Sequence, residues 1–244
     1  IETLRADAVT AEAAPNLYRF AQESVRVPRA YASGNYSVTA FHSLFSANHA
    51  LYADVERQRG DPLGSVPLRI FRQLGYDIHL LASWDFSLNE HAFGRGRHLA
   101  STFVDSRTLT TRPFTPADRP ETIQEWRAQW EVLGGSLTIL DRRVVELFGG
   151  HPALTTGRPQ LLITYLGSTH WPYYWPEDWR PRFEPYTDFL RGQFLYSLAE
   201  RRRLMMNRYR NSVQFVDSLF GAMIHRLKEA GLYEDAIVVV LGDH

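Results

Sequence analysis

Four short polar segments of the sequence could carry chemistry. The two ends of the chain supply carboxylates and an imidazole, at Glu2 and at Asp243-His244. A hydroxyl-rich segment lies at 33–39, and a segment containing a histidine lies at 167–173. Carboxylate and imidazole ligands suit zinc or manganese, and a bound metal acidifies a hydroxyl group into a nucleophile. If these segments meet in space, the chain could catalyse attack by a hydroxyl with the help of a metal.

The elements around these segments predict that they do meet. Strands are predicted at 25–32, 76–83, 161–166 and 236–241, where the last one reads AIVVVL and should be fully buried. Helices are predicted at 15–24, 38–47, 65–74, 120–130, 137–148 and 193–230. This alternation predicts an α/β fold with a mainly parallel central sheet and helices on both faces. Ligands in such sheets gather at the carboxyl ends of the strands, next to which the four polar segments fall.

The longest predicted helix has the clearest pattern. Its apolar residues recur at spacings of four and three, as a stripe that should pack against the sheet: Tyr209, Val213, Val216, Phe220, Met223 and Leu227. Two other regions lack such periodicity. Residues 85–118 read as a surface excursion, and residues 171–186, rich in Trp, Tyr and Pro, read as an ordered loop.

The composition excludes several classes of function. Of the 244 residues, 27 are Lys or Arg and 27 are Asp or Glu, so the net charge of zero argues against a nucleic-acid binder that relies on bulk positive charge. The absence of Cys excludes disulfides, zinc fingers and thiolate catalysis. No apolar run reaches the ~20 residues of a membrane span. Because the chain opens at Ile1 and stops directly after an apolar run, we expect it to be a fragment.

The order of several motifs resembles the sulfatase-like branch of the alkaline phosphatase superfamily, which includes arylsulfatases, phosphoethanolamine transferases and lipoteichoic acid synthases. The motifs are IETLRAD at 1–7, APNL at 14–17, HWPY at 170–173, and segments 31–47, 209–232 and 238–244. The resemblance implies an alkaline phosphatase-like fold truncated at the C-terminus. Residues 1–244 would then be an incomplete catalytic domain, without its C-terminal part or any upstream membrane region, and inactive alone.

The resemblance also implies roles for individual residues. Glu2, Asp243 and His244 would be metal ligands together with Ser37, since Asp243-His244 resembles the opening of the family's Asp-His-Gly motif. Ser37 would also be the nucleophile, because aligning LFSA at 44–47 with the family's Leu-x-Thr-Gly places Ser37 on the catalytic position. Ser37 could instead merely cap the helix at 38–47, and Thr39 is the alternative nucleophile. The implied substrate-binding residues are His170 and Asn35.

The activity that the resemblance implies is that of a metal-dependent hydrolase or transferase acting on phosphate esters, including phosphoryl transfer from lipid headgroups, with zinc or manganese as cofactor. The pair Glu2-Thr3 is closer to phosphoethanolamine transferases than to sulfatases. The partners would be a phosphate ester or lipid headgroup and, through upstream segments, a membrane, but no nucleic acid. By analogy, the protein would be membrane-anchored with its catalytic domain outside the cytoplasm.

Two other functions stay open. A sulfuric ester hydrolase would need a Cys or Ser in a Cys/Ser-x-Pro-x-Arg context for conversion to formylglycine, and residues 37–41 lack both the Pro and the Arg. A non-catalytic, membrane-associated regulator could keep the same fold and bind lipid. Four further polar residues have structural interpretations. His42 and His49 should be packing or surface residues, His79 should be structural within its strand, and Asp217 should be a buried or capping partner in the long helix.

Overall fold

A computed structural model describes residues 1–52, 65–86, 98–109, 137–187 and 197–244. Its sheet has three parallel strands in the order β2-β1-β3: β1 at Asp77–Ala82, β2 at Thr102–Val104 and β3 at Gln160–Tyr165. Leu81 of β1 pairs with Val104 on one side and with Thr164 on the other. The predicted α/β class, the parallel sheet and the strands at 76–83 and 161–166 are therefore confirmed.

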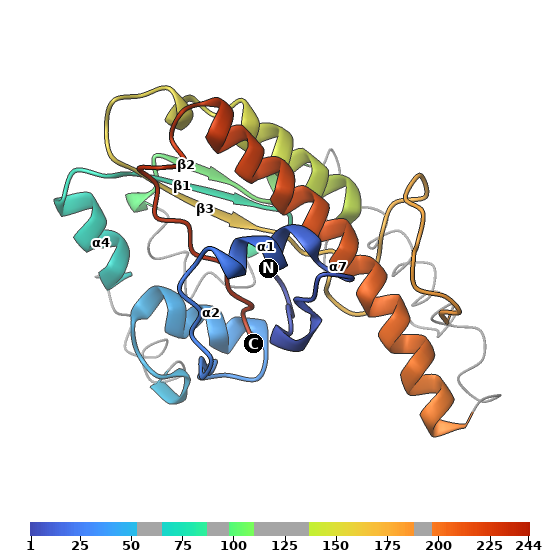
Figure 1. Ribbon diagram of the computed structural model, residues 1–244. Coiled ribbons are helices and arrows are strands. Elements are labelled where there is room, and N and C mark those ends of the chain that lie inside the picture. Colours follow the sequence, from blue (N-terminus) through green and yellow to red (C-terminus); the bar gives the residue numbers. More distant parts are fainter. Residues whose placement is uncertain (53–64, 87–97, 110–136, 188–196) are drawn as a thin grey trace.

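Helices cover both faces of this sheet (Figure 1). On one face lie α1 (Pro15–Gln22), α7 (Leu198–Glu229) and a helix described over residues 137–149. On the other face lie α2 (Ser37–Ser46) and α4 (Val66–Gln73). Side chains of β1 point alternately into the two cores, with Leu81 in the first and Leu80 in the second. The buried strand β1 thus organises both layers.

The predicted apolar stripe of α7 packs against the core: five of its six residues are buried, and Leu227 is half-buried. Tyr209, Val213, Val216, Phe220 and Met223 are all at most 8% exposed. The helix begins after Ser197, whose side chain accepts a hydrogen bond from the Glu200 amide, and ends before Gly231, which has a φ of 69°. Asp217 of this helix accepts hydrogen bonds from the first backbone amides of α1, which confirms its capping role.

Some predictions for the other segments need correction. The surface excursion at 85–118 contains the edge strand β2 and the short helix α5 (Ser106–Leu109), because pairing with β1 compensates for weak local periodicity. The helix predicted at 120–130 lies outside the described residues. The loop at 171–186 is ordered as predicted, without regular structure. The remaining short elements are the 3₁₀ turns η1 (Ala6–Ala8), η2 (Ala50–Tyr52) and η6 (Pro152–Leu154).

Two predicted strands are wrong. Residues 25–32 form no strand, and Val25 is 95% exposed; Pro28 lacks an amide hydrogen, and no ladder partner among the described residues lies beside this segment. Residues 236–241 likewise form no strand and are not fully buried: Ile237 is 94% exposed, while Val238 and Val240 are half-buried. An apolar composition produces a buried strand only where neighbouring elements cover it and pair with it.

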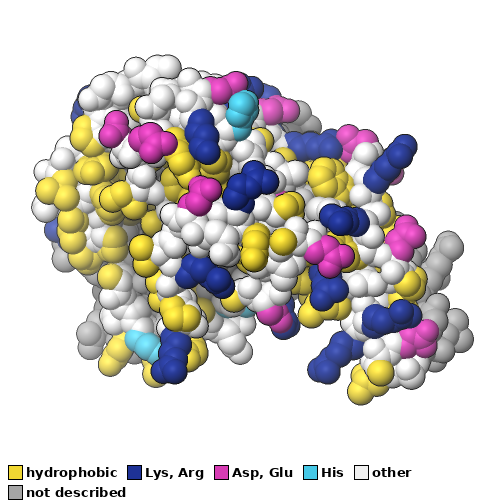
Figure 2. Space-filling model, in the orientation of Figure 1, with side chains coloured by type: hydrophobic (Ala, Val, Ile, Leu, Met, Phe, Trp, Pro, Cys, Tyr) yellow, Lys and Arg dark blue, Asp and Glu magenta, His cyan; other side chains and the backbone are white. Residues whose placement is uncertain are grey.

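The surface in view carries basic and acidic side chains interspersed, with no large area of one sign (Figure 2). This distribution agrees with the zero net charge. Among the described residues, no helix combines the length and the apolar character that a membrane crossing requires.

Candidate active site

The first and last residues of the chain lie side by side at the exit of β3. The Glu2 amide donates to the Leu166 carbonyl at 3.0 Å, and the Ile1 amino group donates to the Leu241 carbonyl at 2.9 Å. The packing is close, because a Cβ added to Gly242 would lie 2.5 Å from the Leu4 carbonyl oxygen. This arrangement brings residues more than 240 positions apart to the carboxyl end of the sheet.

Glu2, Asp243 and His244 form a cluster that could hold a metal ion, since one ligand atom of each lies within 4.8 Å of the others. His244 Nε2 is 3.8 Å from Glu2 Oε1 and 4.0 Å from Asp243 Oδ2. The two carboxylates are 1% and 8% exposed. Burial, followed by the nearby charge of Asp243, raises the pKa of Glu2 to about 8.

The two oxygens of Asp243 have different surroundings. Oδ1 accepts hydrogen bonds from the backbone amides of Thr3, at 2.7 Å, and His244, at 3.1 Å. Oδ2 is buried and has no hydrogen-bond partner. Since a buried carboxylate oxygen without a partner is costly, this atom fits a bound cation. Two carboxylates and an imidazole are a donor set that zinc and manganese accept.

Ser37 joins this cluster. Its hydroxyl donates to Glu2 Oε1 at 2.9 Å. Ser37 is the first residue of α2, while Tyr36 occupies the N-cap position without a side-chain hydrogen bond. The idea that Ser37 caps this helix is therefore wrong: its hydroxyl faces the acidic cluster, where the positive end of the helix dipole favours an approaching anion.

Thr39 and Asn35 are placed differently. The Thr39 hydroxyl donates to the Tyr36 carbonyl at 2.9 Å and packs so closely against Gly34 that a Cβ there would lie 2.0 Å from Thr39 Oγ1. Thr39 thus supports the bend before the helix. Asn35 is exposed, and neither residue is among those that line the pocket at the cluster.

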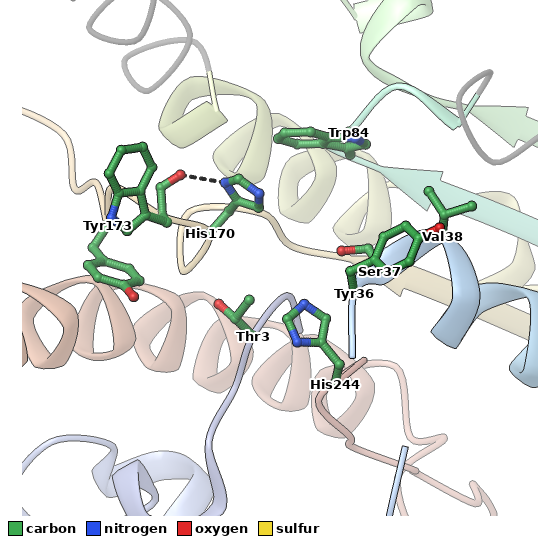
Figure 3. Close-up of a pocket in the computed structure, with 9 residues that line it drawn as sticks. Thr3, Tyr36, Ser37, Val38, Trp84, His170, Tyr173 and His244 are labelled. Carbon is green, nitrogen blue, oxygen red and sulfur yellow. Dashed lines mark hydrogen bonds between the residues drawn. The ribbon is translucent and has the colours of Figure 1, made fainter. Parts of the chain in front are cut away.

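That pocket has a volume of about 510 Å³ and opens beside Ser37 and His244 (Figure 3). His170 lines it, and its ring centroid lies 5.0 Å from that of Trp84. Burial lowers the pKa of the His170 imidazole, whose Nδ1 lies 2.5 Å from the Trp171 carbonyl oxygen. The remaining lining residues are Thr3, Tyr36, Val38, Trp171 and Tyr173.

Sequence reasoning missed Trp84. The signal was present, because Trp84 follows β1 within two residues and so lies at the same carboxyl edge as the polar segments. Trp84, Trp171, Tyr36 and Tyr173 make this pocket strongly aromatic.

Comparison with known proteins identifies the family and the fold of the chain. A sequence model of the sulfatase family matches residues 2–244. A search of curated proteins found no match. Among solved structures, the lipoteichoic acid synthase LtaP from Listeria monocytogenes superposes with a TM-score of 0.59 at 19% identity, over 95% of this chain and 50% of that one. The chain thus spans half the length of LtaP and shares its fold. It belongs to the sulfatase family.

Proposed function

We propose that this sulfatase-family chain is a metal-dependent hydrolase or transferase that acts on phosphate esters, with Ser37 as its nucleophile. One observation carries the proposal: a hydroxyl at the start of a helix donates to a buried carboxylate inside a cluster that could hold a metal. The same hydroxyl borders the aromatic pocket, where a substrate could reach it.

Glu2, Asp243 and His244 would hold the metal together with Ser37. The partnerless Oδ2 of Asp243 and the raised pKa of Glu2 both indicate a site that lacks compensating positive charge. A bound divalent ion would lower the pKa of a hydroxyl ligand and offset negative charge on the reacting group. Zinc and manganese are the ions best suited to these ligands.

The chain's own residues would supply the nucleophile, stabilise the phosphate charge and bind the substrate. The Ser37 oxygen would form a bond to phosphorus as the ester P–O bond breaks; the serine proton passes to solvent and the leaving oxygen takes up a proton. The first amides of α2 favour the phosphate charge. His170 lines the pocket, and its neutral imidazole donates from Nδ1 to the Trp171 carbonyl, so Nε2 can accept a hydrogen bond from a substrate hydroxyl or amino group. Water or an acceptor alcohol would then release the phosphoryl group.

The substrate class and location extend this proposal. The aromatic wall of the pocket supports an organic group attached to the phosphate, such as a lipid headgroup or an acceptor alcohol. From the family resemblance, we also propose that residues 1–244 are part of a larger catalytic domain, that the protein is anchored to a membrane, and that this domain lies outside the cytoplasm.

The test uses protein expressed from its complete reading frame and loaded with Zn²⁺ or Mn²⁺. Release of nitrophenol from bis-p-nitrophenyl phosphate, lost on adding a chelator and restored by the metal, is the expected result. Faster release from p-nitrophenyl sulfate would indicate a sulfuric ester hydrolase instead. No turnover of either compound, combined with binding to lipid vesicles, would indicate a non-catalytic regulator.

A further inference from the structure

A buried carboxylate outside the cluster contacts the turn that follows β3. Asp141, on the helix over residues 137–149, is fully buried. One of its oxygens accepts from the Gly167 amide and the other from the Ser168 amide, both at 2.8 Å. No basic side chain in the described part of the chain forms an ion pair with it. The Asp141 carboxylate therefore faces two consecutive backbone amides, and the hydroxyls of Ser83 and Ser168 also favour its charge.

The turn held in this way contacts the cluster on its other side. The Thr169 hydroxyl donates to the Glu2 carbonyl at 2.5 Å, and the Thr3 hydroxyl donates to the Thr169 carbonyl at 2.5 Å. The first of these bonds is shielded from water, since Thr169 and Glu2 are at most 1% exposed. Thr169 thus fixes the backbone on which the Glu2 carboxylate is mounted.

The same turn places two further groups. Its Gly167 carbonyl accepts from the His170 amide at 2.8 Å, which sets the start of the segment that carries the imidazole into the pocket. The Thr3 amide donates to Asp243 Oδ1 at 2.7 Å and so orients the second carboxylate. A continuous series of hydrogen bonds leads from Asp141 through the turn to Glu2, Thr3 and Asp243.

We propose that Asp141 is a positioning residue for this site: by holding the turn at residues 167–170, it fixes the orientation of Glu2, Asp243 and His170. This inference rests on the proposed function for its catalytic meaning, whereas the hydrogen-bond series itself can be tested without metal. Asn at position 141 has nearly the same shape but only one acceptor oxygen. Its amino group would face one of the two amides, so one buried backbone donor would lose its partner.

The first experiment measures amide hydrogen exchange in the metal-free protein for the wild type and Asp141→Asn. Exchange at Gly167 and Ser168 should accelerate by about tenfold, and exchange at Glu2 and Thr3 should accelerate several-fold. Asp217→Asn is the matched control, because Asp217 is also buried and also accepts from two consecutive backbone amides. It should accelerate exchange at Asn16 and Leu17 alone.

Unchanged exchange at Glu2 and Thr3 in Asp141→Asn would overturn the proposal. If that variant fails to fold, Thr169→Val removes only the hydroxyl that donates to the Glu2 carbonyl. It should accelerate exchange at Glu2 and Thr3 and leave Gly167 and Ser168 protected. Normal protection at Glu2 and Thr3 in this variant would equally refute the proposed role.

A metal titration separates this inference from the proposed function. Asp141→Asn should weaken Mn²⁺ binding by about 10- to 100-fold, as changes behind metal ligands do, while Asp217→Asn should not. Equal affinities for the two variants would contradict the positioning role. A wild-type protein that binds neither Mn²⁺ nor Zn²⁺ would instead count against the proposed function, and the exchange data would then decide the role of Asp141.

Discussion

Asp217 and Asp243 are both buried carboxylates, 1% and 8% exposed, yet their surroundings differ completely. Both oxygens of Asp217 accept hydrogen bonds from α1, at 2.7 Å from the Leu17 amide and 3.1 Å from the Asn16 amide. In Asp243 only Oδ1 is used in this way, and Oδ2 lies buried without a hydrogen-bond partner near Glu2 and His244. Burial alone therefore does not distinguish a structural carboxylate from one at a functional site. The difference is whether both of its oxygens accept hydrogen bonds.

The energetic consequence follows from the charges. The amides at the start of α1 offset part of the cost of burying the Asp217 carboxylate, although burial still raises its pKa, and they join α1 to α7. Asp243 has another carboxylate as a close neighbour, and its charge helps to raise the pKa of Glu2. The cluster at the sheet edge is thus electrostatically unfavourable without a cation, which is typical of a functional site.

The largest effect should come from the hydroxyl that joins the uncompensated cluster. Ser37→Ala should lower kcat/KM by about 10³-fold or more, because the nucleophile is removed, while metal affinity should fall far less, because Glu2, Asp243 and His244 remain as ligands. The control Thr39→Ala should lower kcat/KM by less than about fivefold, because this hydroxyl bonds to the Tyr36 carbonyl. Steady-state kinetics decides, and the reverse ranking would transfer the nucleophile role to Thr39.

The two aspartates themselves should give opposite profiles. Asp243→Asn should weaken Zn²⁺ or Mn²⁺ binding by at least about 100-fold without loss of metal-free stability, because Asn keeps the acceptor for the Thr3 amide. Asp217→Asn should cost about 1–3 kcal/mol of unfolding free energy and leave metal affinity unchanged. Calorimetric titration and urea unfolding measure the two quantities. Similar changes in metal affinity and in unfolding free energy for the two variants would contradict this difference between Asp217 and Asp243.

Metal affinity should depend on pH through Glu2. With the pKa of Glu2 raised to about 8, a metal must displace a proton from the carboxylate below that pH. Affinity should therefore rise with pH, by up to about tenfold per unit between about pH 6 and pH 8, and then level off. Titrations at several pH values check this, and Glu2→Gln should remove this part of the slope.

The same shift predicts the pH dependence of metal-free stability. Between the ordinary value of 4.5 and about 8, folded Glu2 holds a proton that the unfolded chain has lost. The free energy of unfolding should therefore fall as pH rises through this window. Glu2→Gln should lack this fall. Urea unfolding across the window provides the measurement, and a wild-type stability that rises there would contradict the assigned cause.

The smallest effects should come from two glycines, one in each region. A Cβ at Gly34 would lie 2.0 Å from Thr39 Oγ1, so Gly34→Ala should cost about 1–3 kcal/mol and displace the start of α2, lowering kcat several-fold. A Cβ at Gly221 would lie 2.8 Å from the Asn16 side chain, at the contact between α1 and α7. Gly221→Ala should stay within about 1 kcal/mol of the wild type, because gained helix propensity offsets the crowding. Its kcat should not change, and thermal unfolding with kinetics tests both variants.

Much of the fold could be predicted from local patterns. The stripe along α7 predicted its buried face, and the apolar runs at 76–83 and 161–166 predicted β1 and β3 to within one or two residues. The patterns failed at 25–32 and 236–241, where strand composition occurs without strand pairing. Hydrophobic periodicity reports what a segment can bury, whereas burial itself also needs a partner.

The candidate site, too, could be predicted only in part from local sequence. The residue types and their places after predicted strands were sufficient to nominate Glu2, Ser37, His170, Asp243 and His244, because parallel strands end at one edge of their sheet. Thr39 and Asn35 were nominated on the same local grounds, and only side-chain direction separates them from Ser37. Direction depends on the bend at Gly34 and on the packing of Thr39 against it.

By itself, then, the sequence determined the class of fold, the helical and strand periodicities, and which side chains could hold a metal or attack a substrate. The tertiary structure alone decided that Glu2 lies beside Asp243, that Asp243 Oδ2 is left without a partner and that Asp141 supports the turn behind them. The physical reason is the distance along the chain. Contacts between residues 26 to 241 positions apart depend on how whole elements pack, which no local pattern encodes.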